Sequence, residues 1–301
     1  MGNTQELVEL LRILGDPTRL RLLLTLGRGE LTVSEITCVT GLSQPRVSRH
    51  LELLCDVHVL QRTRDQNEVY YRANVDEDRN RLVQEVLNCL PDDDLEIAQD
   101  CHRLIEILNN RQTRACELLD ELGVTPLDTT AINEVGEIVE KLLQGRMPDE
   151  TPFGDLLDIG TGTGSMLRLL ARKVTRAIAV DRSREMRLVA RAQVTLEGLT
   201  NCTVRDGDMY KLSFPKESFD IVTMDRVLGT ADRPHDALEQ AASVLQKDGH
   251  LLVVETKGSP INKKNLGSHL TKARLAPVEV IQNSNEGLLI ALAIRSTVSS
   301  Q

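Results

Sequence analysis

Residues 155–164 limit the possible folds of this chain more than any other segment. An apolar strand pattern there leads into three alternating glycines, Gly160, Gly162 and Gly164, and then into a helical pattern. Glycines let a ligand approach the backbone, and the first N–H groups of the helix would point at that ligand. We therefore expect a strand, a nucleotide-holding turn and a helix. The alternative is an ordinary strand-turn-helix corner that holds no ligand.

The residues around these glycines indicate which nucleotide fits. A dinucleotide-binding turn has the spacing G-x-G-x-x-G, which this turn lacks, and Asp158 stands two positions before Gly160. A carboxylate there would repel the pyrophosphate of NAD, but it would favour the sulfonium and ammonium groups of S-adenosylmethionine. The turn therefore favours S-adenosylmethionine.

Acidic residues also end the apolar strand patterns that follow. Asp181 ends the pattern 177–180 and lies 21 positions after Gly160, close to the distance of about 20 at which a ribose-binding acid is expected. Asp208 and Asp225 follow the next two strand patterns. Their order along the chain is consistent with one ligand site built from several strand ends.

From residue 165 onward, helical patterns alternate with apolar strands. Helical patterns span 165–173, 184–197 and 235–246, and a strand pattern at 251–254 follows a tight turn at 247–249. This alternation predicts a parallel, doubly wound sheet of the α/β class. Residues 277–283 and 287–295 are too close for a crossover helix between them, so we expect an antiparallel pair.

From Asp155 onward, these features resemble class I S-adenosylmethionine-dependent methyltransferases. The resemblance implies a Rossmann-like fold and an adenosyl ligand. The residues implied to bind it are Asp158, Gly160, Thr161, Gly162, Gly164, Asp181, Arg182, Asp208, Met209 and Asp225. Methyl transfer mainly needs positioning and desolvation, so a methyltransferase need show no catalytic triad. No base with a partner stands out, and catalytic residues stay unassigned.

The N-terminal residues carry a different pattern. Helical patterns span 7–14, 20–26, 32–39 and 43–54. Asp16 and Pro17 are typical of the start of the second helix, and Ser43 should cap the fourth after the turn at 40–42. The apolar face of the fourth helix consists of Val47, Leu51 and Leu54. Its other face is polar and basic.

Residues 57–63 and 69–73 alternate as strands around the polar tip 64–67, which predicts a two-stranded wing. If the fourth helix lies in a major groove, its polar side chains would reach base edges and phosphates. The expected DNA-contacting residues are Ser43, Gln44, Arg46, Ser48, Arg49, His50, Arg62 and Arg64. A basic helix by itself is more often a solvated face, but here it belongs to a complete winged helix-turn-helix pattern.

Residues 4–75 resemble the ArsR family of winged-helix repressors, with the motifs D-P-T-R-L and S-Q-P-x-V-S-x-H-L. The resemblance implies double-stranded operator DNA as a partner and a homodimer paired through the helices before and after the winged core. Metal-sensing members carry E-L-C-V-C-D in the third helix, whereas this chain has hydroxyls at Thr32 and Ser34. Hydroxyls are poor ligands for soft metals, and residues 76–100 contain no histidine, so no metal is expected.

Residues 76–149 are expected to form dimerisation and connecting helices. Apolar stripes mark helices over 82–90, 104–122 and 132–142, with a break from Gly123 to Pro126. We interpret the acidic run from Asp92 to Asp94 as a solvated helix start, and Pro148 as part of a domain boundary. The expected domains are 1–75, 76–149 and 150–301.

Composition restricts the remaining possibilities. The net charge is −9, but the first 73 residues hold nine arginines and nine acidic residues, so the excess acid lies in the rest of the chain. The lack of a long apolar run or signal-peptide pattern predicts a cytoplasmic protein without membrane partners. Six cysteines without a C-x-x-C pair predict reduced, buried thiols, and Cys38 is expected to be a packing residue.

Two functions therefore remain open. In the preferred one, a DNA-binding regulator, expected to act as a repressor, uses its methyltransferase-like domain to sense S-adenosylmethionine or S-adenosylhomocysteine. In the alternative, the domain is an active small-molecule methyltransferase that the fused ArsR-like domain autoregulates. The preference rests partly on the few aromatic rings, three Tyr, three Phe and no Trp, available to line a substrate cleft.

Overall fold

The computed structural model describes residues 3–74, 77–91, 93–125, 129–143, 152–256, 258–283 and 287–295. The chain divides into two units, Met1–Leu118 with Ala192–Thr200, and Leu119–Arg191 with Asn201–Gln301. The signals noted at Asp92, Pro126 and Pro148 lie outside the described residues.

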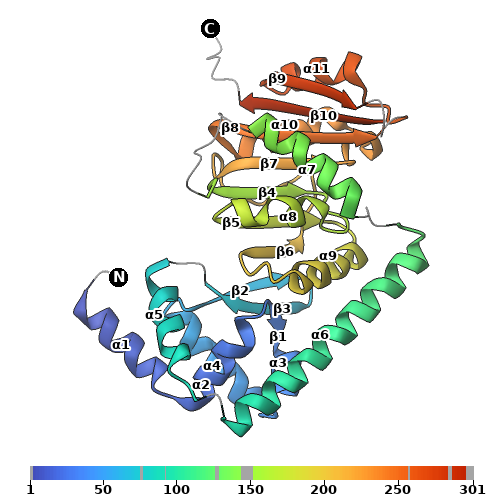
Figure 1. Ribbon diagram of the computed structural model, residues 1–301. Helices are drawn as coiled ribbons and strands as arrows, with labels where there is room; N and C mark the ends of the chain where they lie inside the picture. Colours follow the sequence, from blue (N-terminus) through green and yellow to red (C-terminus); the bar gives the residue numbers. More distant parts are fainter. Residues whose placement is uncertain are drawn as a thin grey trace. The chain divides into compact units, whose positions relative to one another are not determined.

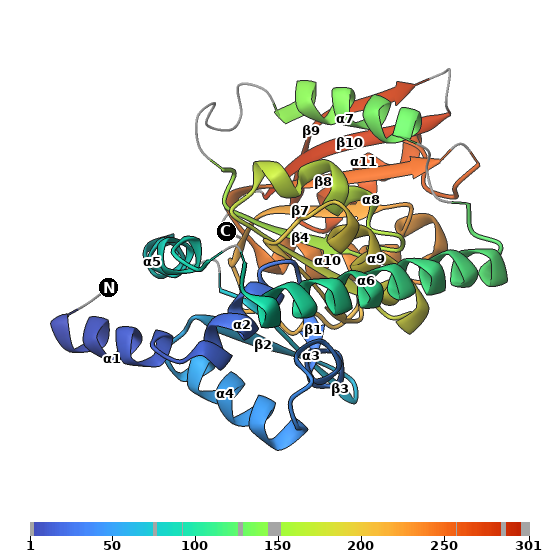
Figure 2. The ribbon, with the colours of Figure 1, turned by 60° about the horizontal axis from the view of Figure 1, so that its bottom comes forward.

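The first unit is a winged helix-turn-helix (Figure 2). Its helices are α1 (Thr4–Leu14), α2 (Pro17–Leu26), α3 (Val33–Thr40), α4 (Gln44–Asp56), α5 (Glu77–Asn88) and most of α6 (Leu95–Leu122). Its strands are β1 (Leu31–Thr32), β2 (Leu60–Asp65) and β3 (Glu68–Ala73), paired antiparallel in the order β1-β3-β2. The predicted fold and the predicted two-stranded wing, β2 with β3, are confirmed. The two-residue strand β1 joins the sheet of the wing, and it is too short to show an alternating pattern.

Local sequence signals explain how these helices begin. Asp16 caps α2 by accepting a hydrogen bond from the Arg19 backbone at 3.1 Å, and Pro17 occupies the first turn. Asp94 caps α6 through the backbone N–H groups of Glu96 and Ile97, as expected for a helix start. Ser43 holds the predicted N-cap position of α4. Its side chain makes no capping hydrogen bond, so the prediction that Ser43 caps the helix is wrong.

The core of this unit forms around α4. Val47, Leu51 and Leu54 are fully buried, which confirms the predicted apolar face. Because this face is anchored in the core, the opposite face of α4 is held toward solvent. No described helix is both long enough and apolar enough to cross a membrane.

The second unit is a seven-stranded sheet in the order β6-β5-β4-β7-β8-β10-β9, with helices on both faces (Figure 1). Its strands are β4 (Asp155–Ile159), β5 (Arg176–Asp181), β6 (Cys202–Asp206), β7 (Phe219–Asp225), β8 (Leu245–Thr256), β9 (Leu275–Asn283) and β10 (Leu288–Arg295). Its helical elements are α7 (Thr129–Leu143), α8 (Ser165–Leu170), η1 (Ala171–Lys173), the larger part of α9 (Arg184–Leu196), η2 (Leu228–Thr230), α10 (Pro234–Val244) and α11 (Lys263–Lys272). The strands β4 to β8 run parallel, and β10 is antiparallel to both of its neighbours. The predicted Rossmann-like sheet with an antiparallel pair is confirmed.

Two sequence-based expectations about this protein are wrong in detail. The turn expected at 247–249 lies inside β8, where Asp248 has a φ of 62° and the register with β7 shifts. The cysteines are all free, but Cys38, Cys89, Cys101 and Cys116 are exposed rather than buried. A helical pattern predicts the helix that carries a thiol, but the face on which the thiol lies depends on packing with distant segments.

Candidate ligand pocket and DNA-contact face

The carboxyl ends of β4, β5, β6 and β7 border a cavity of about 580 Å³, a volume within the usual range for small-molecule sites. In the sheet, β5 and β6 lie on one side of β4, and β7 and β8 lie on the other. Doubly wound folds bind ligands at the point where the strand order reverses in this way. Seven predicted ligand residues line the cavity: Gly160, Thr161, Gly162, Asp181, Arg182, Met209 and Asp225. The cavity lining described in the structure does not include the other three, Asp158, Gly164 and Asp208.

The glycine turn has a conformation that side chains would oppose. Gly160, Gly162 and Gly164 have φ values of 69°, 53° and 85°, all in the left-handed region. A Cβ atom on Gly160 would lie 2.5 Å from a methyl carbon of Val227. The backbone N–H groups of Gly160 and Thr161 both donate to the carbonyl of Val180, at 2.8 and 3.1 Å. The turn is therefore held against the end of β5.

Asp181 faces this turn. Its Oδ2 accepts a hydrogen bond from the Gly162 backbone at 2.9 Å, and its Oδ1 accepts one from the Ser183 backbone at 2.8 Å. These two bonds fix the orientation of the carboxylate beside the cavity. Because each carboxylate oxygen has two acceptor sites, both oxygens keep capacity for a ribose hydroxyl.

Asp158 lies inside β4, with a side chain that is buried to 1% exposure. Its Oδ1 accepts a hydrogen bond from Oγ1 of Thr223 at 2.6 Å, whereas Oδ2 has no hydrogen-bond partner among the described residues. Burial raises the pKa of Asp158 to about 6, and the hydroxyls of Thr161 and Thr223 oppose this rise. Asp158 is therefore buried within β4 rather than exposed on the cavity wall.

The remaining two predicted residues have structural contacts. Gly164 takes the N-cap position of α8, and Oδ1 of Asp208 accepts a hydrogen bond from the Tyr210 backbone at 2.9 Å. Asp208 thus shapes the loop that brings Met209 to the cavity.

Sequence reasoning missed several residues of the cavity wall. They are Val124, Thr125, Thr163, Met186, Gly207, Arg226, Val227 and Thr230. Most of them follow a predicted strand end by a few positions. Including the residues just after each strand end would have found them. Val124 and Thr125 follow α6, 35 or more positions before the glycine turn, and no sequence signal connects them with it.

Asp225 and Arg226 form a tight pair on the wall. Nε and Nη2 of Arg226 donate to the two carboxylate oxygens of Asp225, at 2.8 and 2.6 Å. Arg226 has a φ of 56°, and its backbone N–H donates to the carbonyl of Val254 at 2.7 Å. Such strained positions in non-glycine residues concentrate at functional sites. Both carboxylate oxygens of Asp225 are thus engaged by Arg226.

The predicted DNA-contacting residues lie on α4 and β2. Ser43, Gln44, Arg46, Arg49, Arg62 and Arg64 are exposed, and Ser48 and His50 are half-buried. Nη2 of Arg46 donates to Oγ1 of Thr18 at 3.2 Å, and Nε of Arg64 donates to the carbonyl of Gln66 across the wing tip. Both guanidinium groups keep further donors for phosphates or base edges.

His50 does not add a positive charge to this face at neutral pH. Burial lowers its pKa, and the nearby guanidinium groups of Arg19, Arg46 and Arg49 lower it further, although Asp16 acts in the opposite direction. A neutral imidazole remains a polar group that can donate or accept a hydrogen bond. Across the described ranges, no group of three or more His, Cys, Asp or Glu residues could hold a metal ion.

Comparisons with known proteins agree with both folds. The family described as bacterial regulatory protein, arsR family, matches residues 16–57, and the family described as methyltransferase domain matches residues 157–253. A probable mercury resistance operon repressor of Streptomyces lividans is 38% identical over 93 residues, which cover 31% of this chain and 73% of that protein. The uncharacterized methyltransferase YcgJ of Bacillus subtilis (strain 168) is 33% identical over 100 residues, which cover 33% of this chain and 40% of YcgJ.

The chain spans half or less of the length of several relatives, YcgJ among them. Among solved structures, the [4+2]-cyclase SpnF is similar with a TM-score of 0.51 and 16% identity, covering 62% of this chain and 93% of SpnF, which shows the fold alone. The two folds and the matched families define a winged-helix regulator fused to a class I methyltransferase domain. The chain belongs to the arsR family of bacterial regulatory proteins.

Proposed function

We propose that this protein is a cytoplasmic transcriptional repressor whose methyltransferase-like domain binds S-adenosylmethionine or S-adenosylhomocysteine as an effector. In this proposal, α4 and β2 contact operator DNA, and the cavity at the carboxyl ends of β4 to β7 holds the adenosyl ligand. The fold does not by itself establish methyl transfer, because unrelated functions share folds and SpnF is a cyclase.

The observation that carries the proposal is what each end of α6 contacts: the cavity at its C-terminal end and the helix-turn-helix at its N-terminal part. This helix runs without interruption over 28 residues, which corresponds to roughly 42 Å at 1.5 Å per residue. At its C-terminal end, Gly123 has a φ of 62° and ends the helix, and the next two residues, Val124 and Thr125, line the cavity. A ligand that contacts these residues would therefore act directly on the end of α6.

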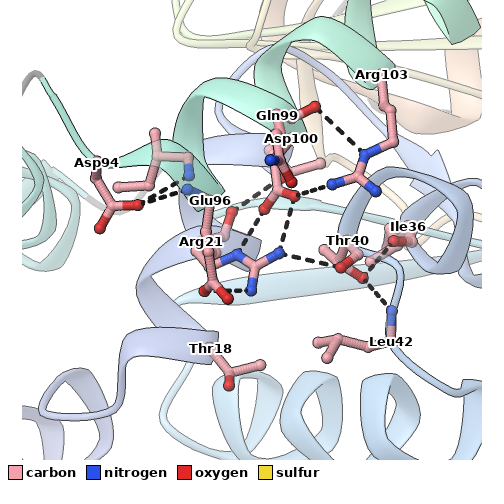
Figure 3. A network of polar contacts seen from close by, with 12 residues as sticks. Thr18, Arg21, Ile36, Thr40, Leu42, Asp94, Glu96, Gln99, Asp100 and Arg103 are labelled. Atoms are coloured by element: carbon pink, nitrogen blue, oxygen red, sulfur yellow. Dashed lines mark hydrogen bonds and ion pairs between the residues drawn. The ribbon is translucent and has the colours of Figure 1, made fainter.

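The N-terminal part of α6 is bound to the helix-turn-helix by two arginine–carboxylate pairs. Arg21 of α2 donates to Asp100 and Glu96 of α6 and to the carbonyl of Thr40 (Figure 3). Further along α6, Arg111 donates to both carboxylate oxygens of Glu35 in α3, at 2.6 and 2.5 Å. Two-pronged pairs of this kind fix orientation as well as distance. Movement of α6 would therefore move α2 and α3, against which α4 packs.

The ionisable residues of the cavity wall favour sensing over catalysis. Within the described lining they are Asp181, Arg182, Asp225 and Arg226. Asp181 already accepts two backbone hydrogen bonds, and Asp225 is paired with Arg226. Neither carboxylate is placed as a free general base, although a methyl transfer that needs only positioning would not require one.

A homodimer would complete the DNA-binding arrangement. The side chains of Val8 and Leu11 on α1 are 41% and 48% exposed. Exposed apolar side chains on one helix are suited to burial against a second copy. Two copies of α4 would then contact two half-sites of a symmetric operator.

Reciprocal titration tests the proposal. The full-length protein is titrated with S-adenosylmethionine and with S-adenosylhomocysteine, with and without a saturating duplex that the protein has selected from a random library. A sensor should bind the ligand with an affinity that the duplex changes by about 5- to 150-fold, and the ligand should change duplex affinity by the same factor. The same preparation is incubated with S-adenosylmethionine and candidate acceptors.

Two outcomes separate the alternatives. An active methyltransferase autoregulated by its ArsR-like domain would release S-adenosylhomocysteine with steady turnover when an acceptor is present. Turnover together with a ligand dissociation constant that the duplex leaves unchanged would overturn the sensor. The absence of binding to either adenosyl ligand would overturn both functions.

A further inference from the structure

Arg187 of α9 is fully buried, at 0% exposure, even though it carries a charge. A guanidinium group without water needs hydrogen-bond acceptors, because an unpaired buried charge is strongly unfavourable. A leucine or methionine could fill the same space without this requirement. The position of Arg187 therefore calls for an explanation in terms of what its donors hold.

Its Nη1 group joins two strand ends. It donates to the carbonyl oxygens of Asp181 and Arg182, at 2.9 and 3.0 Å, and approaches Oδ1 of Asp206 at 3.1 Å. Asp181 is the last residue of β5, Arg182 follows it, and Asp206 is the last residue of β6. One side chain thus links both strands where their regular pairing stops at the residue pair Asp181 and Asp206.

At and beyond that pair, the two adjacent strands become neighbouring parts of the cavity wall. Asp181 and Arg182 line it from the β5 side, and Gly207 and Met209 line it from the β6 side. The backbone bond between the two sides, from Gly207 to the Asp181 carbonyl, is long at 3.4 Å. Arg187 adds shorter bonds at the same place, so it stabilises the separation of the two sides.

The two sides also approach each other closely. A Cβ atom on Gly207 would lie 2.7 Å from the Cβ atom of Val180, so only glycine fits there. Arg187 further fixes the backbone of Asp181, whose carboxylate is oriented by the N–H groups of Gly162 and Ser183. Loss of Arg187 would therefore change both the width of this part of the cavity and the direction of the Asp181 carboxylate.

We propose that Arg187 is a positioning residue, which sets the subsite for the adenosine part of the ligand. The inference rests on the proposed function, in which Asp181 contacts the ribose. It adds a role for a side chain outside the described cavity lining, which acts through the carbonyls of Asp181 and Arg182 and the carboxylate of Asp206.

The same helix offers a matched control. Arg191 lies one turn further along α9, is 3% exposed, and donates to the carbonyl of Val204 at 2.5 Å. Val204 lies within β6 and does not belong to the described cavity lining. Substitution of either arginine removes a buried guanidinium group from α9. Arg187 donates to residues of the cavity wall, whereas Arg191 donates to Val204 inside β6.

The experiment compares Arg187→Met, Arg187→Lys, Arg191→Met and Arg191→Lys in the full-length protein. Isothermal titration measures the affinity for S-adenosylmethionine and for 5′-methylthioadenosine, which shares the adenosine but lacks the amino-acid part. Arg187→Met should weaken both ligands by about tenfold or more and by the same factor, and Arg187→Lys should weaken them less. Both methionine variants should melt at a lower temperature, but Arg191→Met should keep both affinities within about twofold.

The outcomes separate this inference from the proposed function. If the unsubstituted protein binds neither ligand, the proposed function fails and Arg187 has no adenosine to position. If it binds them and Arg187→Met binds as tightly, or if only S-adenosylmethionine is weakened, the inference about Arg187 is overturned. Should the methionine variants not fold, the two lysine variants decide, because affinity must then fall for Arg187→Lys and not for Arg191→Lys.

Discussion

Arg21 and Asp100 form a two-pronged ion pair across 79 positions of the chain, with Nε to Oδ2 at 2.7 Å and Nη2 to Oδ1 at 2.8 Å. The side chains are 12% and 5% exposed. Hydrogen bonding to Asp100 raises the pKa of Arg21, so the guanidinium group keeps its charge. This pair attaches the first turns of α6 to α2, next to the turn that leads into α4.

Asp100→Asn should uncouple the ligand from the operator. The substitution removes the charge but keeps the shape, so α6 should lose its fixed orientation on α2 while the cavity stays intact. We expect ligand affinity within about twofold of the unsubstituted protein, and a ligand effect on operator affinity that falls from about 5- to 150-fold toward none. Arg114→Ala, which removes an exposed pair with Glu117 on the same helix, serves as the control. Full coupling in the Asp100 variant would show that α6 transmits no signal through this pair.

Asp181→Ala should weaken both adenosyl ligands. The carboxylate is expected to accept hydrogen bonds from the ribose, and the loss of a hydrogen bond to a charged group costs about 1.5 to 3 kcal/mol. Calorimetric titration measures the change, with Glu239→Ala on the exposed surface of α10 as the control. Equal affinity in the Asp181 variant would remove it from the ligand site.

Asp158 should make the stability of the ligand-free protein depend on pH. Its folded-state pKa of about 6 exceeds the ordinary value of 3.8. The stabilisation that the protonated Asp158 gives the folded state is therefore complete below pH 3.8, and it is lost as the pH rises through about 6. Compared with Asp158→Asn, the free energy of unfolding should gain about 1 kcal/mol between pH 7.5 and pH 5. Denaturant unfolding of both proteins at several pH values measures this, and parallel curves would contradict it.

Arg46→Ala and Arg49→Ala should both lower operator affinity. An arginine that reads a base should also relax sequence preference, at a cost of about 1 to 3 kcal/mol, whereas one that binds phosphate should reduce the salt slope by about 1. Gel-shift titrations at several salt concentrations distinguish the two roles. Because Arg46 also donates to Thr18, Thr18→Val controls for the loss of that contact. If neither arginine variant differs from the unsubstituted protein, α4 is not the recognition helix.

Local sequence patterns were sufficient to predict both folds and much of the candidate site. Gly160, Gly162 and Asp181 are recognisable because a strand, a tight turn and the next strand end each have a short-range signature. The helix-turn-helix is recognisable for the same reason, since its caps and apolar face recur at fixed spacing. Such signals need no knowledge of what lies across the molecule.

Packing between distant segments decided the rest. It placed Val124 on the wall of the same cavity as the glycine turn, buried Asp158 inside β4 instead of on that wall, and paired Asp225 with Arg226. It also buried Arg187 against two strand ends and joined Arg21 to Asp100. Burial and the choice of partner depend on residues that are far apart in the sequence, so one chain's local periodicity could not reveal them. The sequence by itself determined which elements form and where the glycine turn lies. The tertiary structure decided which side chains line the cavity and which pair α6 with the helix-turn-helix.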